Sequence, residues 1–534
     1  MKYKALIPSA GLGIRLGVKT KNTNKALVSI ANKPVISYII EKFPLNIEIV
    51  IAIGHKGNLI KQYIKLAYPD RKITFVDINP YQGPGSGLGY TILQCKNHLQ
   101  CPFVFCTNDT IVSNDIPIPQ TNWMGYSDVK DNSKYRSITF HNKVITGIFD
   151  KESKSDSFAY IGLSGIRDYE YFWDSMEKGV NNGSISMGET FGLKKLFDSD
   201  HKITAENFDW FDTGTPNGIS KSNGFFLGPD SPNILPKPSE DIWFVNNKVI
   251  KYSEDKDFIK NRVIRAQELN EPNFLPKIID HTENMYSYEM ISGKVFSKCV
   301  NTPLFEKLLS FLVRFWGDLN EPPNHDPIYF NDLCKKFYKE KTYERVQKYF
   351  DRFQKSDEKS IINGVEIPKI YEMLDSLDWE HLCDGKPHKF HGDLHFENIL
   401  VTDNGGFLLL DWRQDFGGNI SPYGDIYYDL AKLLHGIIVS HDIINKENYS
   451  IVEDLDVIEF DFLRSHNSVK CEKTLNDFVV SQGLNEKKVK ILTALVFINC
   501  APLHHQPYSN LLFYLGKYEL YNQAFHRANE PKYS

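Results

Sequence analysis

The segment FHGDLHFENILVTDNGGFLLLDW, residues 390–412, decides how the second half of this chain folds. Two apolar runs of equal length, 399–402 and 407–410, flank an Asp-Asn-Gly-Gly turn. Short apolar runs that meet at a glycine turn are typical of a β-hairpin. The sequence therefore predicts one hairpin over residues 399–410.

The predicted hairpin brings three polar residues together. Arms of equal length return the chain to its starting point, which places Asp411 beside Asn398 and close to Asp393. Phosphoryl transfer needs a carboxylate for the acceptor hydroxyl and an Asn/Asp pair for Mg²⁺. We therefore predict that Asp393 is the catalytic base and that Asn398 and Asp411 bind the metal. The alternative is a surface hairpin with incidental polar ends.

The residues around this hairpin indicate an α+β domain with two lobes. Upstream, Ile242–Val245 and Lys248–Tyr252 flank Asn246-Asn247 and predict a second, smaller hairpin. From about residue 303 the pattern is mainly helical. We assign residues 239–534 to this domain. A turn-rich stretch before it predicts a linker over 226–238.

The first 225 residues have a different pattern. Short apolar runs at residues 4–8, 47–53, 73–77 and 102–106 alternate with helix-length segments. Alternation of this kind favours an α/β domain with an open, mostly parallel sheet. Because ligands of such sheets bind at the carboxyl ends of the strands, residues that follow these runs are candidates for a site.

A glycine loop follows the first predicted strand, with Ala10, Gly11, Gly13 and Arg15, and Lys25 comes shortly after it. Glycines let backbone N–H groups approach a phosphate closely. A dinucleotide fold requires G-x-G-x-x-G and a later acidic residue, and here the third glycine is misplaced. One arginine and one lysine suit a free triphosphate better, although a purely structural turn remains the alternative.

Two isolated aspartates lie far apart in the sequence, and both are candidates for a metal ligand. Asp109 follows the fourth predicted strand, and Asp212 lies in Trp210-Phe-Asp-Thr-Gly-Thr. Mg²⁺ is commonly held by one or two carboxylates together with phosphate oxygens. The two aspartates are therefore predicted to bind one Mg²⁺.

Taken together, the glycine loop, Lys25, Asp109 and the Trp-x-Asp-x-Gly-Thr segment resemble the sugar-phosphate and phosphocholine nucleotidyltransferases over about residues 1–225. The resemblance implies catalytic roles for Arg15 and Lys25 on the triphosphate. It implies further residues for the nucleotide and for the acceptor phosphate: Gln82, Gly85 and Ser86 for the base, and Lys151, Gly162 and Glu189 for the acceptor. The chain departs from the family at Asn24, where proline is usual, and at Asp150, where glutamate is usual.

The second domain resembles the aminoglycoside phosphotransferases and choline kinases, relatives of protein kinases. It has His-Gly-Asp and Asp-Trp where protein kinases have His-Arg-Asp and Asp-Phe-Gly. The resemblance implies a protein-kinase-like fold in which Lys251 binds ATP phosphates and Glu289 and Ile291 line the adenine hinge. Glu268 and Glu271 compete for the role of the helical glutamate that orients the lysine.

Composition narrows the class of protein. A formal net charge of −5 excludes a globally basic protein that coats nucleic acid. No apolar run is long enough for a transmembrane helix, and the first residues do not form a signal peptide. Eight cysteines without a Cys-x-x-Cys pair indicate neither a disulfide framework nor a zinc site. We expect a cytoplasmic enzyme without membrane insertion; the oligomeric state stays open.

The two resemblances imply a bifunctional enzyme. The kinase would use ATP to phosphorylate a small alcohol, which is choline-like, a polyol or a sugar. The first domain would transfer a nucleotidyl group onto that phosphate, with CTP favoured, for surface polysaccharide synthesis. The alternatives are a sugar kinase joined to a transferase that uses UTP, dTTP or GTP, a scaffold with one inactive domain, and a protein kinase with a nucleotide-sensing domain. Gly392 in place of arginine argues against the last.

Overall fold

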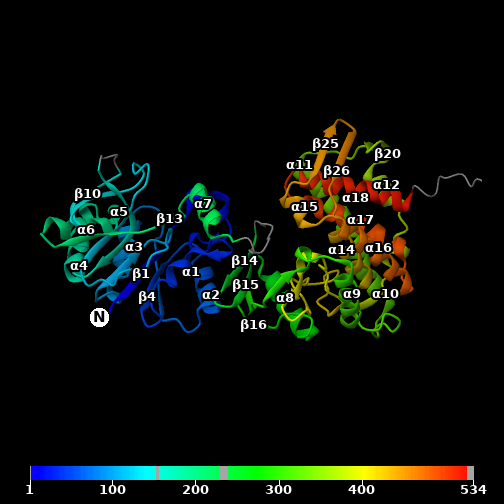
Figure 1. Ribbon diagram of the computed structural model, residues 1–534, viewed down its shortest axis with the longest axis horizontal. Coiled ribbons are helices and arrows are strands. Elements are labelled where there is room, and N and C mark those ends of the chain that lie inside the picture. Colours follow the sequence, from blue (N-terminus) through cyan, green and yellow to red (C-terminus); the bar gives the residue numbers. More distant parts are fainter. Residues whose placement is uncertain (1, 152–155, 229–238, 526–534) are drawn as a thin grey trace, which may run out of the picture. The chain divides into compact units, whose positions relative to one another are not determined.

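The computed structural model describes the chain except for residue 1 and residues 152–155, 229–238 and 526–534. The described residues form two compact units (Figure 1). The first comprises residues 1–256 and 279–290, and the second comprises residues 257–278 and 291–534. Most of the predicted linker lies outside the described residues, so the domain boundaries at 225 and 239 stay predictions.

A nine-stranded sheet organises the first unit (Figure 1). In spatial order its strands are β5 (Ile73–Asp77), β4 (Glu48–Ile53), β1 (Lys4–Ser9), β6 (Phe103–Cys106), β11 (Phe158–Ile166), β8 (Asn122–Ser127), β12 (Ile203–Asn207), β10 (Val144–Phe149) and β9 (Ser137–His141). The first four strands are parallel, as predicted. The rest of the sheet is mixed, because close connections such as the turn between β9 and β10 force neighbours to run antiparallel.

Helices cover both faces of this sheet. Alternate residues of β1 belong to different apolar clusters: Ala5 and Ile7 pack with one set of helices, and Leu6 packs with the other. One face carries α1 (Val35–Ile40) and α2 (Gly57–Ala67), and the other carries α3 (Leu88–Gln94), α4 (Tyr169–Lys178) and α6 (Glu189–Asp198). The first unit is thus a three-layer α/β fold, which agrees with the predicted class.

The strands of the predicted small kinase lobe pack within the first unit. They are β14 (Glu240–Val245), β15 (Lys248–Ser253), β17 (Met285–Glu289) and β16 (Ile278–His281). One face of this sheet joins the apolar core that contains α2: Trp243 is fully buried, and its ring lies 5.1 Å from that of Tyr63. The indole Nε1 donates to Ser29 Oγ at 2.9 Å, and Tyr252 Oη donates to the Asn22 carbonyl at 2.6 Å.

Trp243→Ala is therefore expected to destabilise the first unit by about 3–5 kcal/mol, the usual cost of removing a buried tryptophan. Ile242→Ala, on the opposite and less buried face of β14, is the matched control and should cost clearly less. Denaturant unfolding of the full chain measures both changes. Equal losses for the two variants would show that the α2 side of this sheet is not the buried side.

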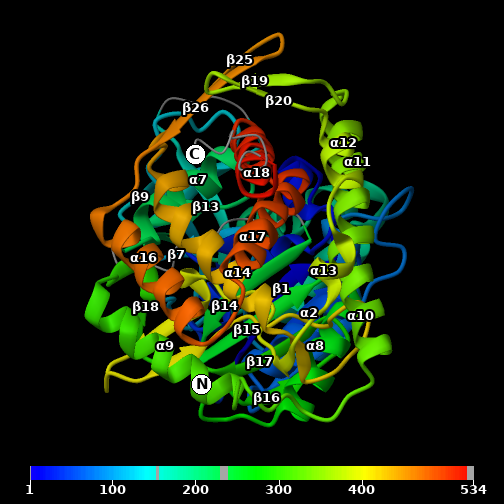
Figure 2. The same ribbon diagram turned by 90° about the vertical axis from the view of Figure 1, so that its right-hand side faces the viewer.

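The second unit is mainly helical (Figure 2). Its longer helices are α8 (Lys256–Leu269), α9 (Thr302–Trp316), α10 (Pro327–Lys335), α11 (Lys341–Phe353), α14 (Ile426–Ile438), α16 (His466–Ser481), α17 (Glu486–Cys500) and α18 (Tyr508–Ala524). Most residues of α14, α17 and α18 are buried. No helix among the described residues is both long and apolar enough to cross a bilayer.

The hairpin predicted from residues 399–410 is present in the second unit. Strand β22 (Ile399–Thr402) pairs antiparallel with β23 (Phe407–Leu409), and Ile399 faces Leu409. A third strand, β18 (Gly293–Val295), adds to the other edge of β22. The hairpin prediction is thus confirmed to within one residue.

Candidate functional sites

The structure brings Asp109 and Asp212 together. Strand β7 (Thr110–Val112) pairs with β13 (Trp210–Asp212), and the Thr213 backbone N–H donates to the Asp109 carbonyl at 2.9 Å. A Cβ placed on Gly214 would lie 2.9 Å from Asp109 Oδ2 and 3.0 Å from Asp212 Oδ1. Both carboxylates therefore face the same small space, which a side chain at position 214 would fill.

Two cations accompany this pair of carboxylates. Lys25 Nζ forms an ion pair with Asp109, and Arg15 Nη2 lies 3.6 Å from Asp109 Oδ2. Burial would raise the pKa of Asp109, but Lys25 and then Arg15 outweigh burial and hold this pKa below its usual value. The arginine side chain is 68% exposed, so it is available to a ligand.

A left-handed glycine and side-chain hydrogen bonds constrain the backbone of the loop before Lys25. Gly13 has φ 68°, and a Cβ there would touch Thr20 and Lys25 at about 3 Å. Asn24, which stands where the family has proline, donates from Nδ2 to the carbonyls of Ser9 and His55 at 3.2 and 2.6 Å. These hydrogen bonds secure the loop in place of a proline. Ala10 and Gly11, the other predicted loop residues, lie directly after β1.

The predicted base-binding residues lie in an exposed loop before α3. Gly83 and Gly85 have φ values of 83° and 82°, and Ser86 Oγ donates to the Gly83 carbonyl at 2.7 Å. Gln82 is exposed. The loop is thus a tight, glycine-dependent turn whose side chains are open to a ligand.

The three predicted acceptor residues have different surroundings. Gly162 (φ 72°) accepts from the Thr107 N–H at 2.9 Å, close to the strand end that carries Asp109. Glu189 begins α6 and is 2% exposed, and burial raises its pKa against the effect of Arg136. Lys151 is exposed directly after β10.

Sequence reasoning missed Tyr135. Its hydroxyl donates to Asp212 Oδ2 at 2.9 Å, and its ring packs edge-on against Trp210 at 5.0 Å. Burial and the Asp212 charge raise the pKa of Tyr135 to about 12, so it stays a donor. Tyr135 therefore orients one predicted metal ligand. No motif marks it, since it lies 77 residues from Asp212.

In the second unit, the predicted phosphotransfer residues lie side by side. Asn398 Nδ2 donates to the Asp393 carbonyl at 2.9 Å and to its Oδ2 at 3.2 Å. The Leu410 N–H donates to the Asn398 carbonyl at 2.7 Å, which brings Asp411 back to this point. Asp411 has a left-handed backbone (φ 60°) and forms an ion pair with Arg262 of α8, which sequence reasoning also missed.

Asp429 supports the loop that precedes Asp393. Its carboxylate accepts from the backbone N–H groups of His391 and Gly392 at 2.9 and 2.7 Å, and from Trp316 Nε1 at 3.1 Å. Burial raises the pKa of Asp429 to about 6 despite these donors. Asp429 therefore fixes the backbone of the loop that leads to Asp393.

Asp393 also contacts two positively charged groups. Lys432 Nζ lies 2.8 Å from Oδ1, and His395 Nε2 lies 3.7 Å from Oδ2. Burial would raise the pKa of Asp393, but Lys432 and then His395 hold it well below its usual value. Burial also disfavours the imidazolium of His395, yet Asp393 and Glu397 outweigh it and raise this pKa to about 9.

His395, Glu397 and His441 have donor atoms within 4.8 Å of one another, a spacing that a metal ion can bridge. However, Glu397 already accepts from His395 Nδ1 at 3.0 Å and from the His441 backbone N–H at 2.9 Å. A protonated His395 between two carboxylates, with Lys432 beside one of them, balances the charge. We therefore interpret the group as a hydrogen-bonded support of Asp393.

The residues predicted to bind ATP are divided between the two units: Lys251 and Glu289 belong to the first and Ile291 to the second. Lys251 is buried on β15 and shares a sheet face with Ile242 and Tyr286, opposite to the face that packs on α2. Glu289 ends β17 and is exposed, and Ile291 is 37% exposed.

Glu268 and Glu271, the two candidates for the glutamate that orients Lys251, differ in exposure and in their partners. Glu268 on α8 is exposed, whereas Glu271, just beyond the helix, forms an ion pair with Lys389. The buried charged residues of α8 are Arg262 and Arg265. This helix therefore turns guanidinium groups, rather than a glutamate, toward the interior of the second unit.

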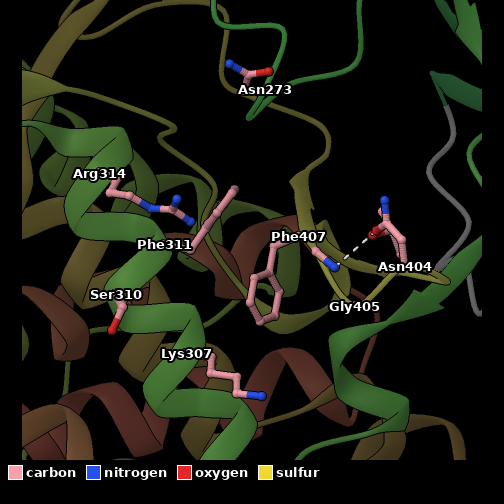
Figure 3. Close-up of a pocket in the computed structure, with 10 residues that line it drawn as sticks. Asn273, Lys307, Ser310, Phe311, Arg314, Asn404, Gly405 and Phe407 are labelled. Atoms are coloured by element: carbon pink, nitrogen blue, oxygen red, sulfur yellow. Dashed lines mark hydrogen bonds between the residues drawn. The ribbon is translucent and has the colours of Figure 1, made fainter.

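A groove of about 530 Å³ lies at the turn of the β22–β23 hairpin (Figure 3). Lys307 and Arg314 of α9 extend toward the turn, and Phe311 and Phe407 lie between the helix and the turn. The groove is at the far end of the hairpin from Asn398 and is not lined by the predicted phosphotransfer residues. We assign no part of the reaction to it.

Comparison with known proteins identifies the second unit's central region. Residues 321–445 match the phosphotransferase enzyme family, APH. This stretch contains Asp393, Asn398 and Asp411. The phosphotransferase resemblance predicted from the hairpin motif is thereby confirmed.

The N-terminal region is similar to archaeal proteins named bifunctional protein GlmU. The protein of Methanococcus vannielii is 31% identical over 249 residues, which cover 45% of this chain and 57% of that protein. The protein of Methanocaldococcus jannaschii is 24% identical over 253 residues, covering 46% and 60%. The chain thus spans under two thirds of these relatives, and it joins a nucleotidyltransferase-like region to a phosphotransferase-family region, as predicted.

Two solved structures resemble part of the chain. A CTP:phosphocholine cytidylyltransferase from Streptococcus pneumoniae has 19% identity and a TM-score of 0.37, covering 42% of this chain and 100% of that one. A UDP-glucose pyrophosphorylase complexed with UDP-glucose has 21% identity and a TM-score of 0.36, covering 42% and 98%. At these TM-scores neither structure bears on the choice of substrate.

Proposed function

We propose that this protein phosphorylates a small alcohol with ATP and then transfers a nucleotidyl group onto the resulting phosphate, releasing pyrophosphate. The observation that carries the proposal is that one chain holds two separate carboxylate sites. One is Asp109 and Asp212 with Lys25 and Arg15, and the other is Asp393 beside Asn398 in the phosphotransferase-family region. The product of the second site is the substrate type of the first.

In the phosphotransferase site, Asp393 would accept the proton of the alcohol hydroxyl as that oxygen attacks the γ-phosphorus of ATP. The hydrogen bond from Asn398 to Oδ2 and the ion pair with Lys432 fix the carboxylate before the substrate arrives. Because phosphoryl transfer asks a protein mainly for positioning and charge stabilisation, such preorganisation is the principal contribution of these residues.

In the nucleotidyltransferase site, a phosphate monoester would attack the α-phosphorus of a nucleoside triphosphate. Arg15 and Lys25 would bind the triphosphate and stabilise the pyrophosphate as it leaves. Lys25 is paired with Asp109 in the free protein and is therefore already oriented toward the site. Lys151, together with Gly162 and Glu189, would receive the monoester.

The residues at both sites fit Mg²⁺. Asp109 and Asp212 present carboxylate oxygens to one small space, and Asn398 and Asp411 lie at one end of the hairpin. Oxygen donors of this kind suit a hard cation. When bound, Mg²⁺ would neutralise phosphate charge and polarise the phosphorus that is attacked.

CTP is our preferred nucleotide, and the preferred acceptor is a choline-like alcohol or a polyol for surface polysaccharide synthesis in the cytoplasm. A sugar, with UTP, dTTP or GTP, is the second candidate. The similarity to GlmU proteins over the N-terminal region supports the nucleotidyltransferase half in either case.

The order of the two steps leads to a prediction. With alcohol, Mg²⁺, ATP and CTP, the full chain should form a CDP-linked product, whereas without ATP it should release no pyrophosphate. The reason is that the first site needs a phosphate monoester for Lys151 to hold. Mass spectrometry of reactions with each of the four triphosphates, with ATP present or omitted, measures order and base preference together. A nucleotide-linked product from the free alcohol without ATP would contradict the order.

A further inference from the structure

Lys432 occupies an unusual place for a lysine. It lies in the middle of α14, whose neighbouring side chains Leu430, Leu433 and Leu434 are at most 1% exposed, and it is itself 6% exposed. Burying an ammonium group is costly unless an anion and hydrogen bonds compensate for the lost hydration. A lysine in an apolar helix therefore needs a specific partner, which here is Asp393.

The two oxygens of Asp393 have separate partners. Oδ1 is 2.8 Å from Lys432 Nζ, and Oδ2 accepts from Asn398 at 3.2 Å. The Asp393 side chain is 33% exposed, whereas that of Lys432 is 8% exposed. The ammonium is therefore the more buried partner of the pair, and it holds Oδ1 while part of the carboxylate stays exposed to an acceptor.

We infer that Lys432 is a positioning residue of the phosphotransferase site, which acts through Asp393 by holding its carboxylate in one orientation toward the acceptor hydroxyl. The inference rests on the proposed phosphotransferase function. It adds a residue from α14, outside the loop and hairpin that carry Asp393, Asn398 and Asp411.

Lys432→Met, which keeps an unbranched side chain one atom shorter and removes its charge, should lower kcat for ADP formation by roughly 10²-fold, the usual effect of losing one preorganised electrostatic partner. The KM for ATP should change little, because the ammonium group of Lys432 pairs with Asp393, the predicted base, and not with a residue predicted to bind ATP. Lys488→Met is the matched control: this lysine is also buried (3% exposed), but it donates to the carbonyls of His381 and Asp384. It should lose comparable thermal stability while keeping kcat.

A second variant separates positioning from folding. Lys432→Ala should regain ADP formation when ethylammonium is added, because this cation offers N–H donors in the vacated space. Tetramethylammonium has no N–H donor and should not restore activity. Wild-type kcat and KM in Lys432→Met would overturn the inference, as would an Ala variant that binds ATP normally yet shows no amine rescue. Retained turnover in Asp393→Asn would instead refute the proposed phosphotransfer itself.

Discussion

Asp393→Asn is expected to lower alcohol-dependent ADP formation by about 10³-fold, within the range that a general base contributes. Asparagine keeps the shape of the side chain but cannot accept the hydroxyl proton, and it leaves Lys432 buried beside a neutral group. Pyrophosphate release from a nucleoside triphosphate and an already phosphorylated acceptor should be unchanged, because Asp393 and the Asp109–Asp212 pair lie in different units.

The measurement follows ADP and pyrophosphate in separate assays of the same preparation, with thermal unfolding as the control for folding. Equal loss of both activities would contradict two independent sites. Loss of neither would show that Asp393 is not the base.

Asp212→Ala is expected to produce the opposite result. Pyrophosphate release should fall by about 10³-fold, because the variant would hold Mg²⁺ poorly and the bound ion stabilises transition-state charge by several kcal/mol, while ADP formation should persist. Asp109→Ala should behave alike, since both carboxylates face the space beside Gly214. The same pair of assays, with acceptor phosphate supplied, measures both variants.

Asp209→Ala is the matched control for this prediction. Asp209 is close in sequence but exposed, and its carboxylate accepts from Ser113 Oγ at 3.0 Å and from Asn114 Nδ2 at 3.3 Å. It should keep pyrophosphate release near the wild-type rate. If Asp209→Ala were the damaging change, the assignment of the metal to Asp212 would be wrong.

The phosphotransferase site was easier to predict from the sequence than the nucleotidyltransferase site, because its residues lie closer together along the chain. Asp393 and Asn398 are five residues apart, and a hairpin of equal arms returns Asp411 to Asn398, so local chain geometry was sufficient to predict their proximity. Asp109 and Asp212 are 103 residues apart, and their pairing was predicted from the carboxylates that Mg²⁺ prefers and from the resemblance to a known family, since local chain geometry does not connect them. The β7–β13 ribbon is what joins them.

Several contacts at the two proposed sites lie outside any sequence motif. Tyr135 at Asp212 and Arg262 at Asp411 come from segments without a motif. Lys432 did leave a sequence signal, since a lysine inside a mostly apolar helix predicts a buried partner. Neither the identity of that partner nor its distance follows from the helix alone.

The sequence by itself determined those features of the structure that arise between residues close together in the chain. Strand–helix alternation indicated the α/β unit, glycine turns predicted the hairpin, and residue spacing predicted the Asp393–Asn398 contact. Only the tertiary structure decided that the strands of the small lobe, with Trp243 and Tyr252, bury one face in the core around α2, and that Lys432 pairs with Asp393. The physical reason is that backbone geometry strongly limits the conformations of short segments. Contacts between distant segments depend instead on how whole apolar faces pack, and the same local hydrophobic pattern is compatible with many such pairings.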